Sequence, residues 1–226
     1  MKKRILYILA ILALLIVAFF VFVKPRVGTY YHEQGLAMMD SANYEQALAD
    51  FSKAIKWKKE FAEAYADRAI AYYQDEQFKQ AIADCEHAIN LNPEIDRAYY
   101  YKALSFFANK NYKKANSFFT QSIERSYNVY LAYTYRGIGK NFMENFDQAL
   151  EDFNQAINID STQAKAFYNR GIARANLGDY SGSIRDYNKA MQLAGENLQA
   201  LLNRVEAKSH LKDYTGTILR TLQILI

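Results

Sequence analysis

The chain has 226 residues, of which 51% are hydrophobic, so it is long and apolar enough to bury a sizeable core. Its net charge of +4 comes from the start of the chain: five of the 28 Lys and Arg residues precede the first acid, and the remaining 23 nearly balance the 24 acidic residues. A surface balanced in this way argues against a nucleic-acid partner, which requires clustered basic charge.

An unbroken apolar run extends from Ile5 to Val23 and follows the basic triplet Lys2-Lys3-Arg4. A helix of roughly 20 apolar residues crosses the hydrocarbon core of a bilayer. A cleaved signal peptide is the alternative, but its apolar region usually has about 7–15 residues and ends at a small-x-small site. No such site ends this run. We therefore expect residues 1–27 to be an uncleaved, single-pass signal-anchor, in which residues 5–23 contact the membrane.

The charges that flank the apolar run predict its orientation. Three basic residues and the terminal amine precede the run, whereas Lys24 and Arg26 follow it. The more basic flank favours the cytoplasm, so we expect the rest of the chain on the non-cytoplasmic side. Pro25 lacks an amide hydrogen and disfavours helix at the preceding residue, so we expect it to end the helix.

Beyond residue 27 one residue pattern returns every 34 positions, which is the signature of stacked supersecondary units. The repeats begin at Gly28, Ala62, Asp96, Tyr130, Ala164 and Leu198. Position seventeen is aromatic in every copy, as Tyr44, Phe78, Tyr112, Phe146, Tyr180 and Tyr214. Position eight is small in five copies, as Gly35, Ala69, Ala103, Gly137 and Gly171. Small residues there allow two antiparallel helices to cross closely, and the aromatic residues fill the gaps between neighbouring pairs.

Position sixteen is polar in five copies: Asn43, Asn111, Asn145, Asp179 and Asp213. A side-chain oxygen there can accept a hydrogen bond from the free amides that open the following helix. This position therefore predicts the start of the second helix in each repeat.

These columns resemble the tetratricopeptide repeat over Gly28 to Ile226. The resemblance implies an all-α fold, in which about six helix-turn-helix repeats form a right-handed superhelical solenoid in residues 28–226 after one transmembrane helix. Cys85 departs from the family pattern at an aromatic position, and Val205 and Thr217 depart from it at small positions.

The expected helix pairs follow the repeats without a linker, so we expect one continuous domain. The expected pairs are 29–40 with 44–57, 63–74 with 78–90, 97–108 with 112–125, 131–142 with 146–158, 165–176 with 180–193, and 199–210 with 214–225.

Two charged columns accompany the repeats. Position seven is basic in five copies, as Arg68, Lys102, Arg136, Arg170 and Arg204, and position twenty-three is acidic in four, as Asp50, Asp84, Asp152 and Asp186. They can form a charged track for a ligand or ion pairs that hold the helices together. We favour the ion pairs, because the two columns recur like a framework.

No residue pattern indicates catalysis. His32, His87 and His210 lie far apart on different repeats, whereas a metal site needs several ligands that converge. Cys85 is the single cysteine and falls in a core column, so we expect an inert buried thiol. We therefore expect neither an enzyme nor a cofactor or metal.

In the family, side chains at positions two, five, six, nine, twelve and thirteen of the repeats line a concave groove. Carried over to this chain, the resemblance implies a partner-binding groove of Tyr73, Arg97, Tyr100, Tyr101, Leu104, Phe107, Tyr135, Ile138, Asn141, Phe142, Lys165, Tyr168, Asn169 and Ile172. Tyr and Arg are common anchors at interfaces. Padding of the superhelix is the alternative role for several of these tyrosines.

One subfamily grips the C-terminal carboxylate of chaperones through Lys, Asn and Arg side chains at fixed groove positions. The corresponding residues here are His32, Leu36, Asp67, Arg97 and Tyr101. The clamp is absent, so a chaperone tail is not the expected partner.

The sequence thus predicts a membrane-anchored scaffold that binds a protein or peptide in an aromatic-rich groove. The alternative is a structural subunit of a membrane-associated assembly. Such a subunit would self-associate through the apolar helix expected at Thr215 to Ile226.

Overall fold

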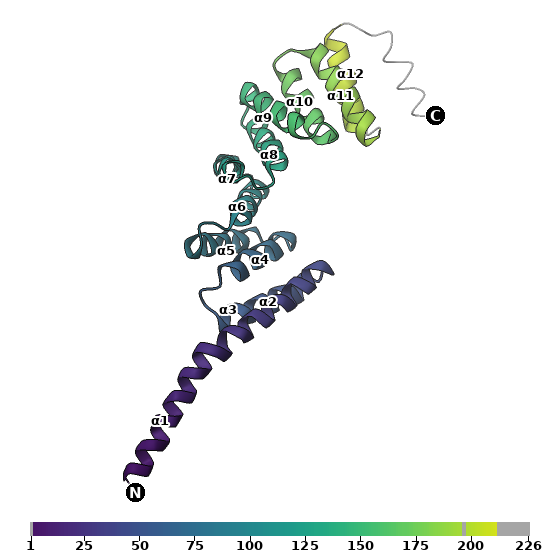
Figure 1. Ribbon diagram of the computed structural model, residues 1–226. Coiled ribbons are helices and arrows are strands. Elements are labelled where there is room, and N and C mark those ends of the chain that lie inside the picture. Colours follow the sequence, from purple (N-terminus) through teal and green to yellow (C-terminus); the bar gives the residue numbers. More distant parts are fainter. Residues whose placement is uncertain (1, 196–197, 212–226) are drawn as a thin grey trace. The chain divides into compact units, whose positions relative to one another are not determined.

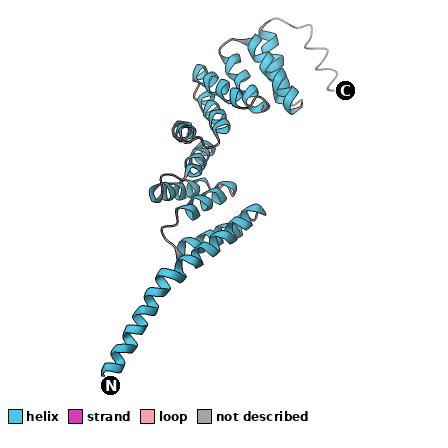
Figure 2. Ribbon diagram, viewed as in Figure 1, coloured by secondary structure: helices cyan, strands magenta, loops and turns pink. Residues whose placement is uncertain are grey.

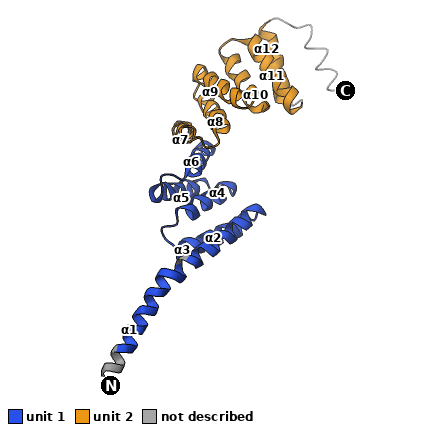
Figure 3. Ribbon diagram, viewed as in Figure 1, with its two compact units in different colours: residues 1–109 blue, residues 110–226 orange. Residues whose placement is uncertain are grey.

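A computed structural model describes residues 2–195 and 198–211, and every regular element within these ranges is helical (Figures 1 and 2). The chain divides into two compact units, residues 1–109 and 110–226, which we describe separately (Figure 3). The first unit contains α1 (Lys2–Ala18), a π-helical turn η1 (Phe19–Val23), α2 (Lys24–Asp40), α3 (Tyr44–Trp57), α4 (Ala62–Gln74), α5 (Phe78–Leu91) and α6 (Asp96–Ala108). The second contains α7 (Tyr112–Glu124), α8 (Val129–Phe142), α9 (Phe146–Ile159), α10 (Ala164–Asn176), α11 (Tyr180–Ala194) and α12 (Leu198–His210).

Each helix of the repeats contacts the next one within its unit, and alternate helices also touch, as α4 does with α6 and α8 with α10. From α3 to α12 the helix ends agree with the expected ends to within two residues. The helix expected at residues 214–225, and with it the expected contact through the chain end, lies outside the described residues.

Pro25 does not end the helix, contrary to expectation. Instead η1 leads directly from α1 into α2, which begins at Lys24 with the proline in its first turn. The Lys24 amide donates to the Phe19 carbonyl, five residues back. In an α-helix a proline cannot donate a hydrogen bond to the carbonyl four residues earlier, and its ring clashes with that carbonyl. A π turn just before the proline shifts the hydrogen bonds from four residues back to five. The apolar run therefore continues into the first repeat without a loop.

The polar residues at position sixteen cap several helices as expected. Asn43 accepts from the Gln46 amide at 3.2 Å, Asn111 from the Lys114 amide at 3.3 Å, and Asp179 from the Gly182 amide at 2.8 Å. Asn145 precedes α9 but makes no such bond. Asp213 lies outside the described residues.

The two helices of a repeat approach each other where position eight meets position twenty-four. A Cβ atom on Gly35 would lie 2.6 Å from the ring of Phe51, and one on Gly171 would lie 2.7 Å from the ring of Tyr187. Gly137 and Phe153 repeat this contact. In the second repeat, where Cys85 replaces the ring, Ala69 takes the place of the glycine, and both residues are fully buried. The third repeat shows that a buried alanine at position eight also accommodates a ring, because Ala103 and Phe119 occupy the same two positions there.

The expected ion pairs between positions seven and twenty-three form within single repeats. Arg68 grips Asp84 with N–O distances of 2.6 and 2.8 Å, Arg136 grips Asp152 at 3.0 and 2.6 Å, and Arg170 grips Asp186 at 2.9 and 2.7 Å. The acids are almost fully buried, so this pairing holds the framework together and the expectation of structural ion pairs is confirmed.

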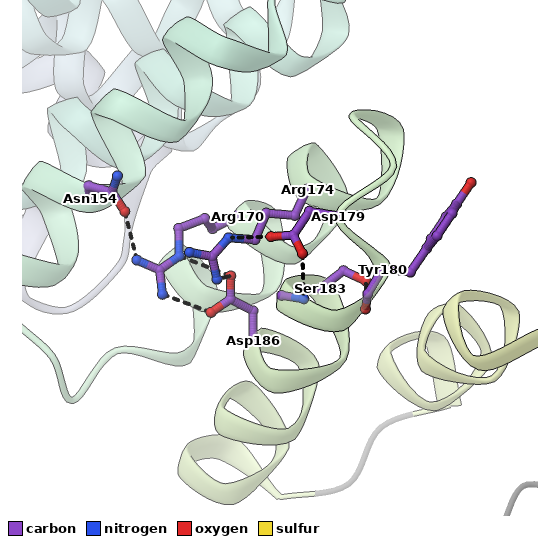
Figure 4. A network of polar contacts seen from close by, with 8 residues as sticks. Asn154, Arg170, Arg174, Asp179, Tyr180, Ser183 and Asp186 are labelled. Atoms are coloured by element: carbon purple, nitrogen blue, oxygen red, sulfur yellow. Dashed lines mark hydrogen bonds and ion pairs between the residues drawn. The ribbon is translucent and has the colours of Figure 1, made fainter. Parts of the chain in front are cut away.

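Each arginine also reaches back to the preceding repeat. Nη1 donates to position twenty-five of the repeat before, from Arg68 to Ser52 at 3.1 Å, from Arg136 to Thr120 at 2.8 Å and from Arg170 to Asn154 at 2.7 Å. Figure 4 shows Arg170 between Asn154 and Asp186, with Arg174 as a second donor to the same carboxylate at 2.7 Å. One guanidinium thus joins three helices, and we call this arrangement the arginine stitch.

We predict that Cys85→Phe lowers the free energy of unfolding by about 1–3 kcal/mol, because the site of Cys85 is fully buried and a ring there overpacks it. The double variant A69G/C85F recreates the Gly35–Phe51 contact and should recover most of that loss. Chemical unfolding of the full chain in detergent, followed by circular dichroism, measures both. The pairing is wrong if the double variant is less stable than C85F alone.

Removal of one guanidinium should destabilise the chain according to what remains beside the acid. Arg68→Met leaves buried Asp84 without its cationic partner and should cost about 3 kcal/mol. Arg170→Met should cost less, about 1–2 kcal/mol, because Arg174 still pairs with Asp186. Thermal unfolding compares the two variants, and equal losses would show that the second donor contributes nothing.

Candidate partner-binding site

In the first unit, the expected groove residues are aromatic or apolar except for Arg97. The Tyr73 and Tyr101 rings lie 5.7 Å apart in an edge-to-face arrangement, and Phe107 is half-buried nearby in sequence on α6. Tyr100 and Leu104 are buried, with exposed fractions of 3% and 7%. The structure therefore leaves Tyr73, Tyr101 and Phe107 as the accessible aromatic members of this unit's set.

His32, Asp67 and Arg97 occupy three of the five positions that a carboxylate clamp would use. Asp67 accepts from Arg97 Nε at 2.8 Å and lies 2.7 Å from His32 Nε2, so three successive first helices meet at one carboxylate. Asp67 is 8% exposed. An anionic chain end placed here would meet a carboxylate that already holds the cation, which agrees with the absence of a clamp in the sequence.

In the second unit, α8 and α10 bring their groove residues into direct contact. Lys165 Nζ lies 3.0 Å from the Tyr135 hydroxyl, and the Asn141 amide donates to the Asn169 carbonyl at 3.0 Å. The ring of Phe142 stacks on Tyr112 at 4.7 Å and is 61% exposed. Ile138 packs against the core around Phe153. These contacts link groove residues of α8 to groove residues of α10, to Tyr112 of α7 and to the core.

A cavity of about 540 Å³ lies next to these residues, between α10, α11 and α12. Tyr168 and Ile172 of the expected groove line it, together with Ala175, Asn176, Tyr180, Tyr187, Gln199, Asn203, Glu206, Ala207 and His210. The volume falls in the range of about 300–1,000 Å³ that is typical of ligand sites.

The walls of the cavity are ordered by side-chain contacts. The Asn203 amide donates to the Tyr168 hydroxyl at 3.2 Å, and Gln199 donates to Asn203 at 2.9 Å. The Tyr180 and His210 rings stack with their centres 4.3 Å apart. Burial raises the pKa of Tyr168 and of Tyr187, so both phenols remain neutral and keep their hydrogens near neutral pH.

The sequence-based groove stopped at Ile172 in the fifth repeat and so contained only two of the eleven residues that line this cavity. Gln199, Asn203, Glu206 and His210 stand at positions two, six, nine and thirteen of the sixth repeat, the positions that the family uses. Asn176 stands at position thirteen of the fifth. The positions of the sixth repeat could have been numbered in the same way, and they would have identified these four residues. The irregular core positions of that repeat made it a less obvious continuation of the groove.

Other chemistry finds no support among the described residues. Within residues 2–195 and 198–211, no group of three His, Cys, Asp or Glu side chains could hold a metal ion. Cys85 is fully buried, and burial raises the pKa of its thiol, which disfavours the reactive thiolate.

The helix pairs, their periodic contacts and the stitched columns define a helical-hairpin repeat protein. Models of the tetratricopeptide repeat (TPR) family match residues 28–61, 62–95, 97–126, 143–178 and 164–197. The chain is therefore a tetratricopeptide repeat protein. No curated protein sequence matches it.

Solved structures share the fold at low sequence identity. PilF from Pseudomonas aeruginosa has 19% identity and a TM-score of 0.73, over 89% of this chain and 91% of its own. PilW, described as a widely conserved type IV pilus biogenesis factor, has 16% identity and a TM-score of 0.74, over 88% and 92%. YrrB, described as a TPR protein with an unusual peptide-binding site, has 23% identity and a TM-score of 0.68, over 76% and 89%.

Proposed function

We propose that this chain is a membrane-anchored scaffold that holds a protein partner through the groove positions of its repeats. The observation that carries the proposal is the cavity between α10, α11 and α12, because it is built from groove positions of two successive repeats. Repeats of this kind are typical of interaction scaffolds rather than enzymes.

The chemistry of the cavity suits an extended or helical peptide. Asn176, Gln199 and Asn203 carry amides that can both donate to and accept from a peptide backbone. Tyr168 and Ile172 provide apolar surface for a side chain of the partner, and tyrosines bury a large area at low entropic cost. Glu206 in the lining favours a neutral or basic segment over an acidic one.

The rest of the proposed groove extends this surface within each unit. In the second unit it comprises Tyr135, Ile138, Asn141, Phe142, Lys165, Tyr168, Asn169 and Ile172, and in the first unit Tyr73, Arg97, Tyr100, Tyr101, Leu104 and Phe107. We propose that a right-handed superhelix of the repeats arranges these side chains on its concave side, as the family resemblance implies.

The proposed anchor is the helical run that begins the chain. Within the described residues, Tyr7–Asp40 contains one stretch that is long and apolar enough to cross a membrane, and none of that stretch is buried in the protein. An anchored groove meets membrane-bound partners at a raised effective concentration. The flanking charges favour a single-pass protein with its repeats on the non-cytoplasmic side.

The alternative function is a structural subunit of a membrane assembly. PilW is a pilus biogenesis factor, and a subunit role here would show itself as a fixed oligomer of the full chain in detergent. A scaffold remains monomeric until it meets its partner, so solution mass separates the two proposals.

We predict that a photo-crosslinker in place of Asn176 captures a discrete partner in native membranes. The same crosslinker at Arg185, an exposed position on α11 that does not line the cavity, is the matched control. Tyr135→Ala in the same chain, a change within the same unit, should weaken capture at least several-fold while helical content is retained. Equal capture at both positions, or capture that is unchanged by Tyr135→Ala, contradicts the groove assignment.

A further inference from the structure

The end of the first hairpin lies beside the point where the apolar helix enters the repeats. A Cβ atom on Gly28 of α2 would lie 3.0 Å from Cβ of Lys58, so the end of α3 packs directly on the start of α2. Beyond this contact, the Trp57 ring lies 6.4 Å from the ring of Phe19 in the π turn. The fold thus brings residues 56–59 next to residues 19–28, although they are far apart in the sequence.

Four basic side chains, which we call the basic collar, gather at this level: Lys24, Arg26, Lys56 and Lys59. Arg26, Lys56 and Lys59 are exposed and Lys24 is half-buried. Within the described residues none of the four has an acidic partner, whereas Lys53, one turn earlier on α3, pairs with Asp50 at 2.8 Å. The collar therefore presents positive charge that the protein itself does not neutralise.

Apolar surface adjoins the collar on the side of the N-terminus. Phe20, Val21 and Phe22 are 56–62% exposed, although each is strongly hydrophobic. A shallow hollow of about 440 Å³ at the same level is lined by Phe22, Val23, Arg26, Val27, Tyr30 and Tyr31. The surface thus changes from apolar to cationic over a short distance. The bilayer changes in the same way where its acyl chains meet its headgroups.

We infer that the basic collar binds the headgroups of anionic phospholipids and holds the first hairpin against the membrane surface. The inference rests on the proposed membrane anchor. We name anionic phospholipid as the ligand of the collar for two reasons. The basic side chains complement the charge of lipid phosphates, and the collar directly adjoins the exposed apolar helix. Trp57 supports the placement, because tryptophan prefers the membrane interface, where one part of its ring system is apolar and its N–H meets polar groups.

The collar has a mechanical consequence for the repeats. Because α1, η1 and α2 follow one another without a loop, the tilt of the apolar helix and the placement of the first hairpin are coupled. Headgroup contacts from both α2 and α3 fix that hairpin at two points around the helix.

Trp57 is the single tryptophan of the chain and reports on the collar directly. The full chain is reconstituted in nanodiscs that contain, at equal mole fraction, either brominated phosphatidylglycerol or brominated phosphatidylcholine, with the other lipid unlabelled. Bromine quenches tryptophan only at short range, so the comparison shows which lipid collects beside Trp57.

At this equal mole fraction we expect phosphatidylglycerol to occupy the positions beside Trp57 about five times as often as phosphatidylcholine, equivalent to about 1 kcal/mol of preference, so the brominated anionic lipid quenches more strongly. The double variant K56Q/K59Q should lose most of this preference, and the charge-matched control K79Q/K113Q, on exposed lysines of α5 and α7, should keep it. Added salt should reduce the preference in the unaltered chain, because it screens exposed charges.

The outcomes separate this inference from the proposal on which it rests. Equal quenching by both lipids, or a preference that survives in K56Q/K59Q, overturns the collar while the anchor stands. Absence of quenching by either lipid places Trp57 away from the bilayer and overturns the collar. Alkaline carbonate extraction of the full chain then tests the anchor separately, because an anchored chain stays with the membrane.

Discussion

The arginine stitch is the interaction on which the arrangement of the repeats depends. A hairpin of two helices buries one face between its own helices and leaves another that only a neighbouring hairpin can cover. Apolar packing brings the hairpins together but tolerates small slips. A guanidinium that grips a buried carboxylate in its own repeat and a polar side chain of the preceding repeat has fixed geometry, so it sets the register between neighbours.

The arginine stitch also limits which side chains can contact a partner. The arginines at position seven donate their hydrogen bonds to residues that hold the repeats together, and Arg97 donates to Asp67. Tyrosines and amides therefore make up most of the proposed groove, and the walls of its cavity are held by hydrogen bonds and ring stacking. This is why we propose a mostly uncharged binding surface on a chain in which 23% of the residues are charged.

The sequence predicted nearly all of the helix boundaries, because each repeat carries the same residue pattern and the copies agree with one another. It also predicted the ion pairs, since two columns of opposite charge recur together. It failed at Pro25, where a rule for an isolated helix ignored the π turn that accommodates a proline. It missed Gln199 and Asn203 because the sixth copy departs from the pattern in its core columns, although its groove positions keep the numbering.

Contacts between residues distant in sequence could not be predicted in the same way. The triad of His32, Asp67 and Arg97 and the approach of Trp57 to Phe19 depend on how successive helices are placed in space. The same placement brings Lys56 and Lys59 to the flank of the apolar helix, which a count of neighbouring charges in the sequence leaves out. Counted with Lys24 and Arg26, they bring the basic groups on this side of the proposed anchor to four, equal to the three side chains and the terminal amine on the other side, so the proposed orientation rests only on the charges adjacent in sequence.

Hydrogen exchange of Arg136→Met, compared with the unaltered full chain by mass spectrometry, tests the stitch most directly. Arg136 lies on α8 and contacts Thr120 of α7 and Asp152 of α9. If one guanidinium joins the three helices, amides of α7 and α9 lose protection together with those of α8, and those of α3 and α4 in the other unit do not change. Loss of protection confined to α8 would contradict the account, because the arginine would then stabilise only its own helix.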